Sequence, residues 1–554
     1  ITYIARSKKI ELSSSTKFKK LINLIIELEE ITGSLVDIEF GIQNNKLYLF
    51  QVRPLIINKA GDNFIKSKIK FEIASTKRSL NKLLKKRKKG DDCLNVLSDM
   101  TDWNPAEMIG VHPKPLSMSL YKYLITNQTW ALARKKIGYK DLSSNKLMIS
   151  LAGHPYINVK NSFNSLIPNG IPNKLSEKLV NYYLEKLEAS TYLHDKVEFE
   201  ILFSCYTPKT EQDLKLLKIK GFSNNEIKVI NSNLKKLTLN ILENPKLSIK
   251  SVLEEIRVLE NNYKIFLNKP QNYDYKTILK SCIKYGILPF AILARYAFIA
   301  SKIFKDMASI GLLSNKNVNK FFNNIQTIAS EGSETFGEVQ KGQVSIDHFL
   351  KRFGHLRPGT YDLLQQRYDE APNKYFKVKK IKMIKPLKKK TNKQLNSNNY
   401  FDEIELINIQ NYLNSLSTKL TASDLIKFAS ESIKAREYSK FQFTKTISHS
   451  LELFKKFAKH HQIKLNDIVF LNVEEILQWD YQKNDMAFKN KLKNKIFYRK
   501  SKYQVHKEIK LPSLIQRETD VENFTIFYDK PNFITEKLIT SECIYVRNLD
   551  EEID

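Results

Sequence analysis

Two groups of residues in this 554-residue chain combine types and spacing that could carry chemistry. The first lies in DIEFGIQNNKLYLFQVRPL, residues 37–55, and comprises Glu39, Gln51 and Arg53. Carboxylate and amide oxygens are hard ligands that suit Mg²⁺, and a guanidinium suits phosphate oxygens. These residues would form the end wall of a Mg²⁺ and polyphosphate site. The alternative is a solvated hairpin face without a function.

The second group lies in FGHLRPGTYD, residues 353–362. Two glycines and a proline favour a tight turn there, and the turn would present His355, Arg357 and Asp362. Such a group could bind an anion and move a proton. It is therefore a candidate site for phosphate or for a small molecule that accepts phosphate. The alternative is a turn whose polar side chains are satisfied by neighbouring carbonyl groups.

Arg295 is the one charged residue in the second half of the most apolar segment, YGILPFAILARYAFIA, residues 285–300. This segment is too short to span a bilayer. An arginine among apolar residues needs a partner or a route to water. We therefore expect one of two roles for Arg295. It forms a buried structural ion pair, or it helps to bind phosphate or a small molecule that accepts phosphate.

Apolar periodicity predicts the elements that position the first group: a helix over 17–31 and strands over 35–40 and 46–52, with a turn at 43–45. Side chains alternate between the faces of a strand. Asp37 and Glu39 therefore share a face of the first strand, and Gln51 and Arg53 share a face of the second. A hairpin would bring Glu39, Gln51 and Arg53 together.

The rest of the chain reads as mainly α, following the small α/β piece at its start. Long helical patterns cover 118–137, 173–192, 222–242, 247–267, 274–312, 421–461 and 484–508. We predict this organisation: an α/β piece at 1–57, a basic and solvated linker helix at 58–90, helical blocks at 91–373 and 401–510, a Lys-rich linker at 374–400, and a tail at 511–554 with strands in FTIFY and CIYV.

The net charge of +32, from 91 Lys and Arg against 59 Asp and Glu, invites a nucleic-acid interpretation. However, 77 of these cations are Lys and 14 are Arg, whereas proteins that clamp phosphates favour the guanidinium. We expect no specific nucleic-acid partner and no membrane partner. The ten lysines within 374–393 indicate an exposed connection, and polyanion binding by this arm is the alternative.

The cysteine and glycine residues limit the classes of protein and of binding site that the chain could represent. Four scattered cysteines do not make a disulfide framework or a Cys-based zinc site, which favours a cytoplasmic protein. The last glycine is Gly359, so no glycine-rich phosphate loop lies after it. The context of His449 is helical and lacks glycine, so we do not expect it to carry phosphate.

Residues 35–55 resemble the closing hairpin of the ATP-grasp domain in phosphoenolpyruvate synthase, pyruvate phosphate dikinase and rifampicin phosphotransferase. The pattern there is D-I-E-W/F, an apolar hairpin and L-Q-x-R-P; this chain has Phe50 in place of the leucine. The resemblance implies that Glu39 and Gln51 help to hold Mg²⁺ and ATP and that Arg53 contacts the phosphates. It also implies ATP and Mg²⁺ as cofactors.

Further stretches resemble the central helical domain of the same phosphoenolpyruvate-utilising enzymes. They are GHLRPGTYD (354–362), DWNPAEMIG (102–110), PFAILARYAFIA (289–300) and REYSKFQFT (436–444). PNFITEKLIT (531–540) is similar to the approach to a swivelling phosphohistidine domain. The resemblance implies the C-terminal end of an ATP-grasp domain followed by a large helical central domain.

The expected function is ATP-dependent phosphotransfer through a phosphohistidine to pyruvate or another small acceptor. Residue 1 is Ile and the chain stops on NLDEEID, so we expect both ends to be cut. The glycine-rich loop and the carrier histidine would then lie outside the chain, which alone should be inactive. The alternative is a helical binding or scaffold protein with degenerate enzyme modules and a basic arm for polyanions.

Overall fold

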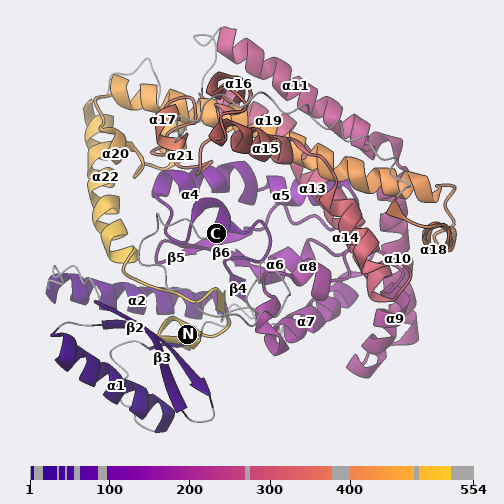
Figure 1. The fold of residues 1–554 in the computed structure, drawn as a ribbon, viewed down its shortest axis with the longest axis horizontal. Helices are drawn as coiled ribbons and strands as arrows, with labels where there is room; N and C mark the ends of the chain where they lie inside the picture. Colours follow the sequence, from indigo (N-terminus) through magenta and orange to yellow (C-terminus); the bar gives the residue numbers. More distant parts are fainter. Residues whose placement is uncertain are drawn as a thin grey trace.

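The computed structural model describes residues 2–4, 16–33, 36–43, 46–54, 63–84, 96–268, 275–376, 400–478 and 486–525. Helices make up most of this part and the strands are short, so the predicted mainly α fold is confirmed (Figure 1). The assignment of the N-terminal piece to an ATP-grasp domain stays a prediction.

The N-terminal piece contains the predicted helix and hairpin, together with a short strand, β1, Thr2–Ile4, that was not predicted. Helix α1 is Thr16–Thr32, and the antiparallel strands are β2, Val36–Gln43, and β3, Lys46–Pro54. The register shifts between Glu39 and Phe40, where a β-bulge interrupts the ladder. Figure 1 shows α1, β2 and β3 as a small unit at one corner of the molecule.

Helix α2, Asn63–Leu84, lies within the predicted linker 58–90. Its interpretation as a solvated linker helix is wrong for one face. Leu80 is fully buried in a small core with Leu97 and Ile515, and Glu72 accepts a hydrogen bond from His506 at 2.9 Å. The many basic residues of α2 made its narrow apolar stripe hard to recognise in the sequence. This stripe packs on the C-terminal part of the chain. The basic run 85–90 lies outside the described residues.

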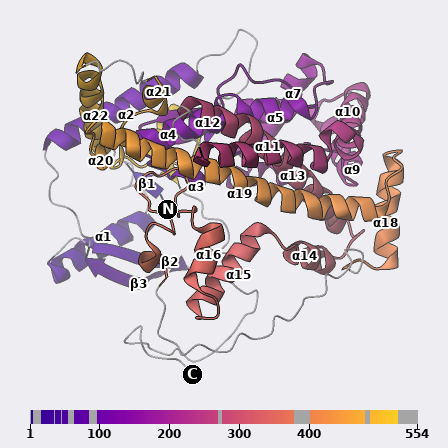
Figure 2. The ribbon, with the colours of Figure 1, turned by 90° about the horizontal axis from the view of Figure 1, so that it is seen from above.

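The helical body is built around two long helices that pack along each other, α13, Leu288–Ser309, and α19, Ala422–His460. Thr421 and Asp424 form a capping box that starts α19. Figure 2 shows α19 running across the body, with α11, Ile249–Asn268, α12, Tyr275–Cys282, and α13 beside it. The predicted helices over 173–192, 222–242 and 247–267 correspond to α7, α10 and α11.

A π-helical turn, η8, Ile283–Ile287, joins α12 to α13. A Cβ atom at Gly286 would lie 2.8 Å from side-chain atoms of both Leu259 and Phe443, so only glycine allows α11 and α19 to approach here. In the part of the chain that the structure describes, Tyr275–Ser309 is the one helical stretch long and apolar enough to cross a membrane. Its apolar window is 72% buried in the structure, as in the core helix of a soluble protein.

A four-stranded sheet in the order β5-β6-β4-β7 was not predicted. Its strands are β5, Met148–Leu151, β6, His154–Asn158, β4, Leu97–Ser98, and β7, Leu514–Ile515. Strands of two to five residues are too short to show a period of two. The sheet joins the beginning of the helical body to the tail.

The remaining elements are β1 Thr2–Ile4, α3 Pro105–Ile109, α4 Pro115–Tyr121, η3 Lys122–Thr126, α5 Thr129–Lys136, α6 Val159–Asn164, α7 Asn173–Ala189, η4 Thr191–Leu193, α8 Val197–Glu200, α9 Thr210–Lys215, η5 Leu216–Lys220, α10 Asn224–Glu243, η6 Pro245–Leu247, α14 Asn315–Asn323, α15 Ile328–Gln340, α16 Ile346–Phe353, α17 Pro372–Tyr375, α18 Glu403–Ser415, α20 Leu465–Ile468, α21 Val473–Leu477, α22 Met486–His506, η10 Glu518–Val521 and β8 Asn523–Thr525. Strand β8 pairs with β1 and includes the first two residues, 524 and 525, of the predicted strand FTIFY. Most of the Lys-rich linker, with CIYV and PNFITEKLIT, lies outside the described residues.

Candidate functional site

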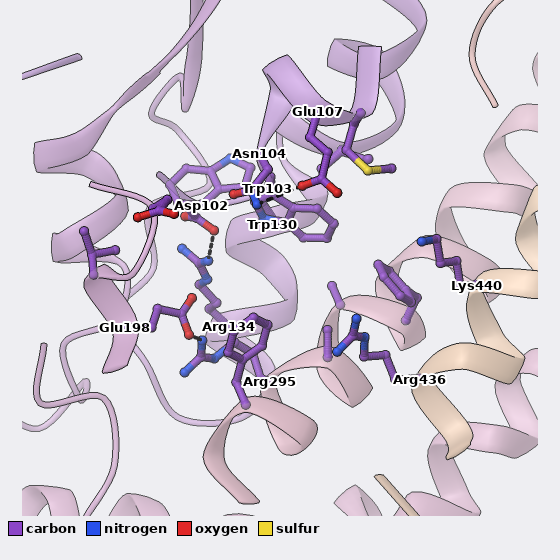
Figure 3. Close-up of a pocket in the computed structure, with 18 of the residues that line it drawn as sticks. Asp102, Trp103, Asn104, Glu107, Trp130, Arg134, Glu198, Arg295, Arg436 and Lys440 are labelled. Atoms are coloured by element: carbon purple, nitrogen blue, oxygen red, sulfur yellow. Dashed lines mark hydrogen bonds and ion pairs between the residues drawn. The ribbon is translucent and has the colours of Figure 1, made fainter. Parts of the chain in front are cut away.

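A cavity of about 280 Å³ lies in the helical body between α13, α19 and the segment that leads into α3. We call it the Arg295 cavity. Each of the four stretches that resemble the central helical domain contributes to its wall: 102–110, 289–300, 354–362 and 436–444. Figure 3 shows its polar side chains, Asp102, Asn104, Glu107, Arg134, Glu198, Arg295, Arg436 and Lys440, with Trp103 and Trp130.

One wall is fixed by a buried ion pair. Arg134 Nη2 donates to Asp102 Oδ1 at 2.6 Å, and Ser162 donates to the other carboxylate oxygen at 2.6 Å. The Asp102–Asn104 turn has φ values of 62°, 59° and 36°, in the left-handed region that non-glycine residues rarely adopt. The hydroxyl of Tyr121 donates to Trp103 O at 2.6 Å and helps to hold this turn.

A second ion pair lies below the first in Figure 3. Arg295 Nη1, from α13, donates to a carboxylate oxygen of Glu198, from α8. Arg295 is 4% exposed. Burial by itself lowers the pKa of Arg295, but the Glu198 carboxylate and the Tyr139 side chain together outweigh burial and raise that pKa. The guanidinium is therefore charged, and the expected buried ion pair of Arg295 is confirmed.

The same cavity is lined by residues with unsatisfied buried donors. Within the described residues, Arg295 Nε and Nη2, Trp130 Nε1 and the Tyr361 hydroxyl have no hydrogen-bond partner. Trp130 is 0% and Tyr361 1% exposed. Buried polar groups are satisfied in the great majority of cases. A bound group with acceptor oxygens could satisfy these donors.

The opposite wall comes from α19. Arg436 and Lys440 lie on the far side of the cavity from Glu198 in Figure 3. They are four residues apart on one helix, so they share a face. Arg436 Nε also pairs with Glu437 at 3.2 Å.

The structure separates the predicted group His355, Arg357 and Asp362 from Arg295. Arg357 is 6% exposed and donates to Glu452 at 2.9 Å and Ser448 at 3.1 Å, both on α19. Asp362 accepts from the Leu364 amide at 3.0 Å. These three residues do not line the Arg295 cavity. Hydrogen bonds satisfy Arg357 Nη1 and Nη2, but Arg357 Nε and His355 Nε2 have no hydrogen-bond partner among the described residues, so the turn is satisfied internally only in part.

His355 contacts the ring of Phe441, with centroids 4.9 Å apart. Burial, with the nearby positive charge of Lys445, lowers the pKa of His355 to about 3. The ring is therefore neutral near pH 7 and is poorly suited to donate a proton. The turn itself still reaches two cavities: Tyr361 lines the Arg295 cavity, and Leu356 lines a second, mostly apolar cavity of about 470 Å³.

The hairpin has the register that its alternation predicted. Glu39 lies directly opposite Gln51, and position 37 lies directly opposite position 53. Opposed residues of an antiparallel pair share a face. Glu39 and Gln51 are both exposed and can supply two oxygen ligands to a metal ion. The described residues contain no group of three or more His, Cys, Asp or Glu that could hold a metal ion, so this pair fits a partial ligand set.

His449 lies inside α19, as its helical context predicted. Its ring contacts that of Tyr263, with centroids 5.9 Å apart, and burial lowers its pKa. This environment is that of a core histidine.

Sequence reasoning missed several residues of the Arg295 cavity. Asp102 and Arg436 open stretches that it singled out by resemblance, but no role was assigned to them. Arg134 and Glu198 gave no local signal, because each is an ordinary charged residue on a short helix whose partner lies far along the chain. No protein-family model matches the chain, and none of the curated proteins searched matches it.

Proposed function

We propose that the chain belongs to an ATP-dependent phosphotransferase of the phosphoenolpyruvate synthase type. In this proposal the β2–β3 hairpin contributes to nucleotide binding, and the helical body binds the phosphate acceptor, which is pyruvate or another small molecule. The observation that carries the proposal is the hairpin register, with Glu39 opposite Gln51 and position 37 opposite position 53. This register places positions 39, 51 and 53, to which the resemblance assigns contacts with Mg²⁺ and ATP, on one face of the hairpin.

Each hairpin residue has a chemical role in this proposal. Glu39 and Gln51 supply oxygen ligands to Mg²⁺, which would neutralise charge on the ATP phosphates, and Arg53 contacts phosphate oxygens. Phosphoryl transfer depends mainly on such positioning and charge neutralisation. The phosphate would pass from ATP to a carrier histidine and then to the acceptor.

The Arg295 cavity supports the second half of the proposal. Four stretches picked out by resemblance are far apart in sequence, yet all contribute to the wall of this one cavity. A set of family-like residues that converges on a cavity with unsatisfied donors suits a binding site better than a structural core. The alternative, a non-catalytic scaffold, would not require this convergence.

Phosphoenzyme formation tests the proposal without knowledge of the acceptor. A protein that contains this chain together with a carrier histidine would be incubated with Mg²⁺ and ATP labelled in the β and γ phosphates, and acid-labile, base-stable label on the protein would be counted. We expect labelling of the parent protein and at least a tenfold loss in Glu39→Gln and Arg53→Ala, on the order expected for charge-assisted phosphate contacts.

The matched control is Lys46→Ala, which removes an exposed cation from the same hairpin. It should label like the parent. Absence of label in the parent protein, or equal labelling in all variants, would reject the proposal and favour the scaffold. The 554-residue chain by itself is expected not to consume ATP with pyruvate, and turnover by it would contradict the carrier arrangement proposed here.

A further inference from the structure

We propose that the Arg295 cavity binds the oxyanion, carboxylate or phosphate, of a small molecule with an aromatic or otherwise planar apolar body, and that Arg295 is its main anion ligand. The inference deepens the proposed function, because the identification of this molecule as the acceptor rests on that function. The binding itself can be tested separately.

The free donors of Arg295 define the anion site. Nε and Nη2 are the two nitrogens without a partner among the described residues, whereas Nη1 is held by Glu198. Nε–H and one N–H of Nη2 lie on the same edge of the guanidinium and point in parallel. This is the edge that grips carboxylate or phosphate oxygens with two hydrogen bonds. Glu198 therefore orients Arg295 through Nη1, and Tyr139 also interacts with the guanidinium, while the Nε and Nη2 edge lacks an acceptor at hydrogen-bond geometry.

The remaining unsatisfied groups select the same chemistry. Trp130 Nε1 can only donate, and the Tyr361 hydroxyl lacks an acceptor within the described part of the chain. A ligand that satisfies these groups has to present acceptor oxygens. Leaving such groups buried without a partner costs about 1–3 kcal/mol each, and more for a charged group.

The acidic residues of the wall do not oppose an anion as strongly as their number suggests. Both carboxylate oxygens of Asp102 are occupied, by Arg134 and by Ser162, and Glu198 is paired with Arg295. Of the described residues that line the cavity, five are cationic and four are acidic. Among the lining residues the cations exceed the acids by one. Lys440 lies on the wall opposite Glu198, beside Arg436, whose charge is paired with Glu437.

The size and apolar lining of the cavity limit the rest of the ligand. The volume of about 280 Å³ is at the lower end of small-molecule sites. Aromatic side chains, those of Trp103, Trp130, Phe290 and Phe298, form much of the wall. Aromatic walls favour a planar apolar body that stacks between them.

Intrinsic fluorescence provides a direct measurement. Two of the three tryptophans of the protein, Trp103 and Trp130, line the cavity. The probes are benzoate, phenyl phosphate and the neutral benzamide, titrated into the protein at constant ionic strength. We expect a saturable change with benzoate or phenyl phosphate, at least about tenfold tighter than with benzamide, since a charge-assisted bidentate contact contributes that much. The stronger of the two anions identifies the oxyanion class.

Two variants assign the binding to Arg295. Arg295→Gln removes the anion ligand and should weaken anion binding at least about tenfold while leaving benzamide unchanged. Ala294→Phe fills the cavity from the preceding position of α13 without changing a charge, and it should abolish the response to all three probes. Ala294→Phe keeps the test valid if loss of the Arg295–Glu198 pair unfolds the protein. The control is Arg352→Gln, an arginine with a 54% exposed side chain that pairs with Glu331.

Equal affinity for benzamide and both anions would overturn the inference, as would anion binding that survives Ala294→Phe. No response to any probe would also overturn it and would leave ordered water as the partner of the unsatisfied donors. These outcomes are separate from the phosphoenzyme assay. Label without probe binding rejects this inference alone, and probe binding without label rejects the phosphotransferase.

Discussion

Arg134 and Asp102 form an ion pair of 2.6 Å whose two side chains are only 4% and 5% exposed. The pair joins α5 to the left-handed turn Asp102–Asn104, which forms one wall of the Arg295 cavity. Its position explains how a strained turn persists: the charge, two serine hydroxyls and the Tyr121 hydroxyl over-determine the turn.

Asp102→Asn should destabilise the protein by about 3 kcal/mol, because it leaves the Arg134 charge buried without its partner. The free energy of unfolding from urea titration measures this loss. The control is Glu255→Gln, which removes an exposed partner from Lys136, on the same helix as Arg134; its effect should be under about 1 kcal/mol. Equal effects of the two substitutions would contradict a special role for the buried pair.

Leu80→Ala should cost about 3 kcal/mol, since Leu80 is 0% exposed and its truncation opens a cavity beneath α2. Phe71→Ala on the same helix is the control, because Phe71 is 67% exposed. Thermal unfolding followed by circular dichroism distinguishes them. If Leu80→Ala unfolded like the parent protein, α2 would be the solvated linker that its composition suggested.

Arg357→Gln should release the turn 354–369 from α19, because Arg357 bonds to Ser448 and Glu452. Hydrogen exchange should speed up at the amides of Tyr368 and Asp369, which donate to Leu356 O at 2.9 Å and Gly354 O at 3.1 Å. Stability should fall by about 2 kcal/mol. Unchanged exchange together with lost phosphotransfer would instead assign Arg357 to the phosphate.

The buried His355 should make stability depend on pH. Its pKa is about 3 in the folded protein, against the ordinary value of 6.5, so between these values the unfolded state binds the proton and the folded state does not. Stability therefore falls as the pH drops from 6.5 towards 3, by about 1 kcal/mol per pH unit from this group. Unfolding in urea at pH 7 and pH 5 measures the slope.

His355→Phe should remove that part of the slope, because phenylalanine does not titrate and suits a site beside Phe441. The comparison with the parent protein is essential, since Asp99, whose pKa burial raises to about 6, contributes a slope of opposite sign between pH 4 and 6. The exposed His348→Gln serves as the control. An identical slope in His355→Phe would show that His355 titrates normally.

The amino-acid sequence by itself determined the local features. Alternation over residues 35–54 predicted the hairpin and the face shared by Glu39 and Gln51, because a period of two is written in neighbouring residues. The long helices followed from apolar periodicity in the same way. The sequence also indicated that Arg295 needs a partner, because it is a single cation in an otherwise apolar helix.

Only the tertiary structure decided which distant residues meet. Arg295 pairs with Glu198, which is 97 positions away in the sequence, and Arg357 pairs with Glu452, which is 95 positions away. It separated Arg295 from His355, buried one face of α2, and added a sheet of very short strands. Such pairings depend on how the helices pack, and no local sequence pattern encodes them. The chain contains many Asp and Glu residues, and the sequence alone does not show which of them will lie beside a given arginine in the folded protein.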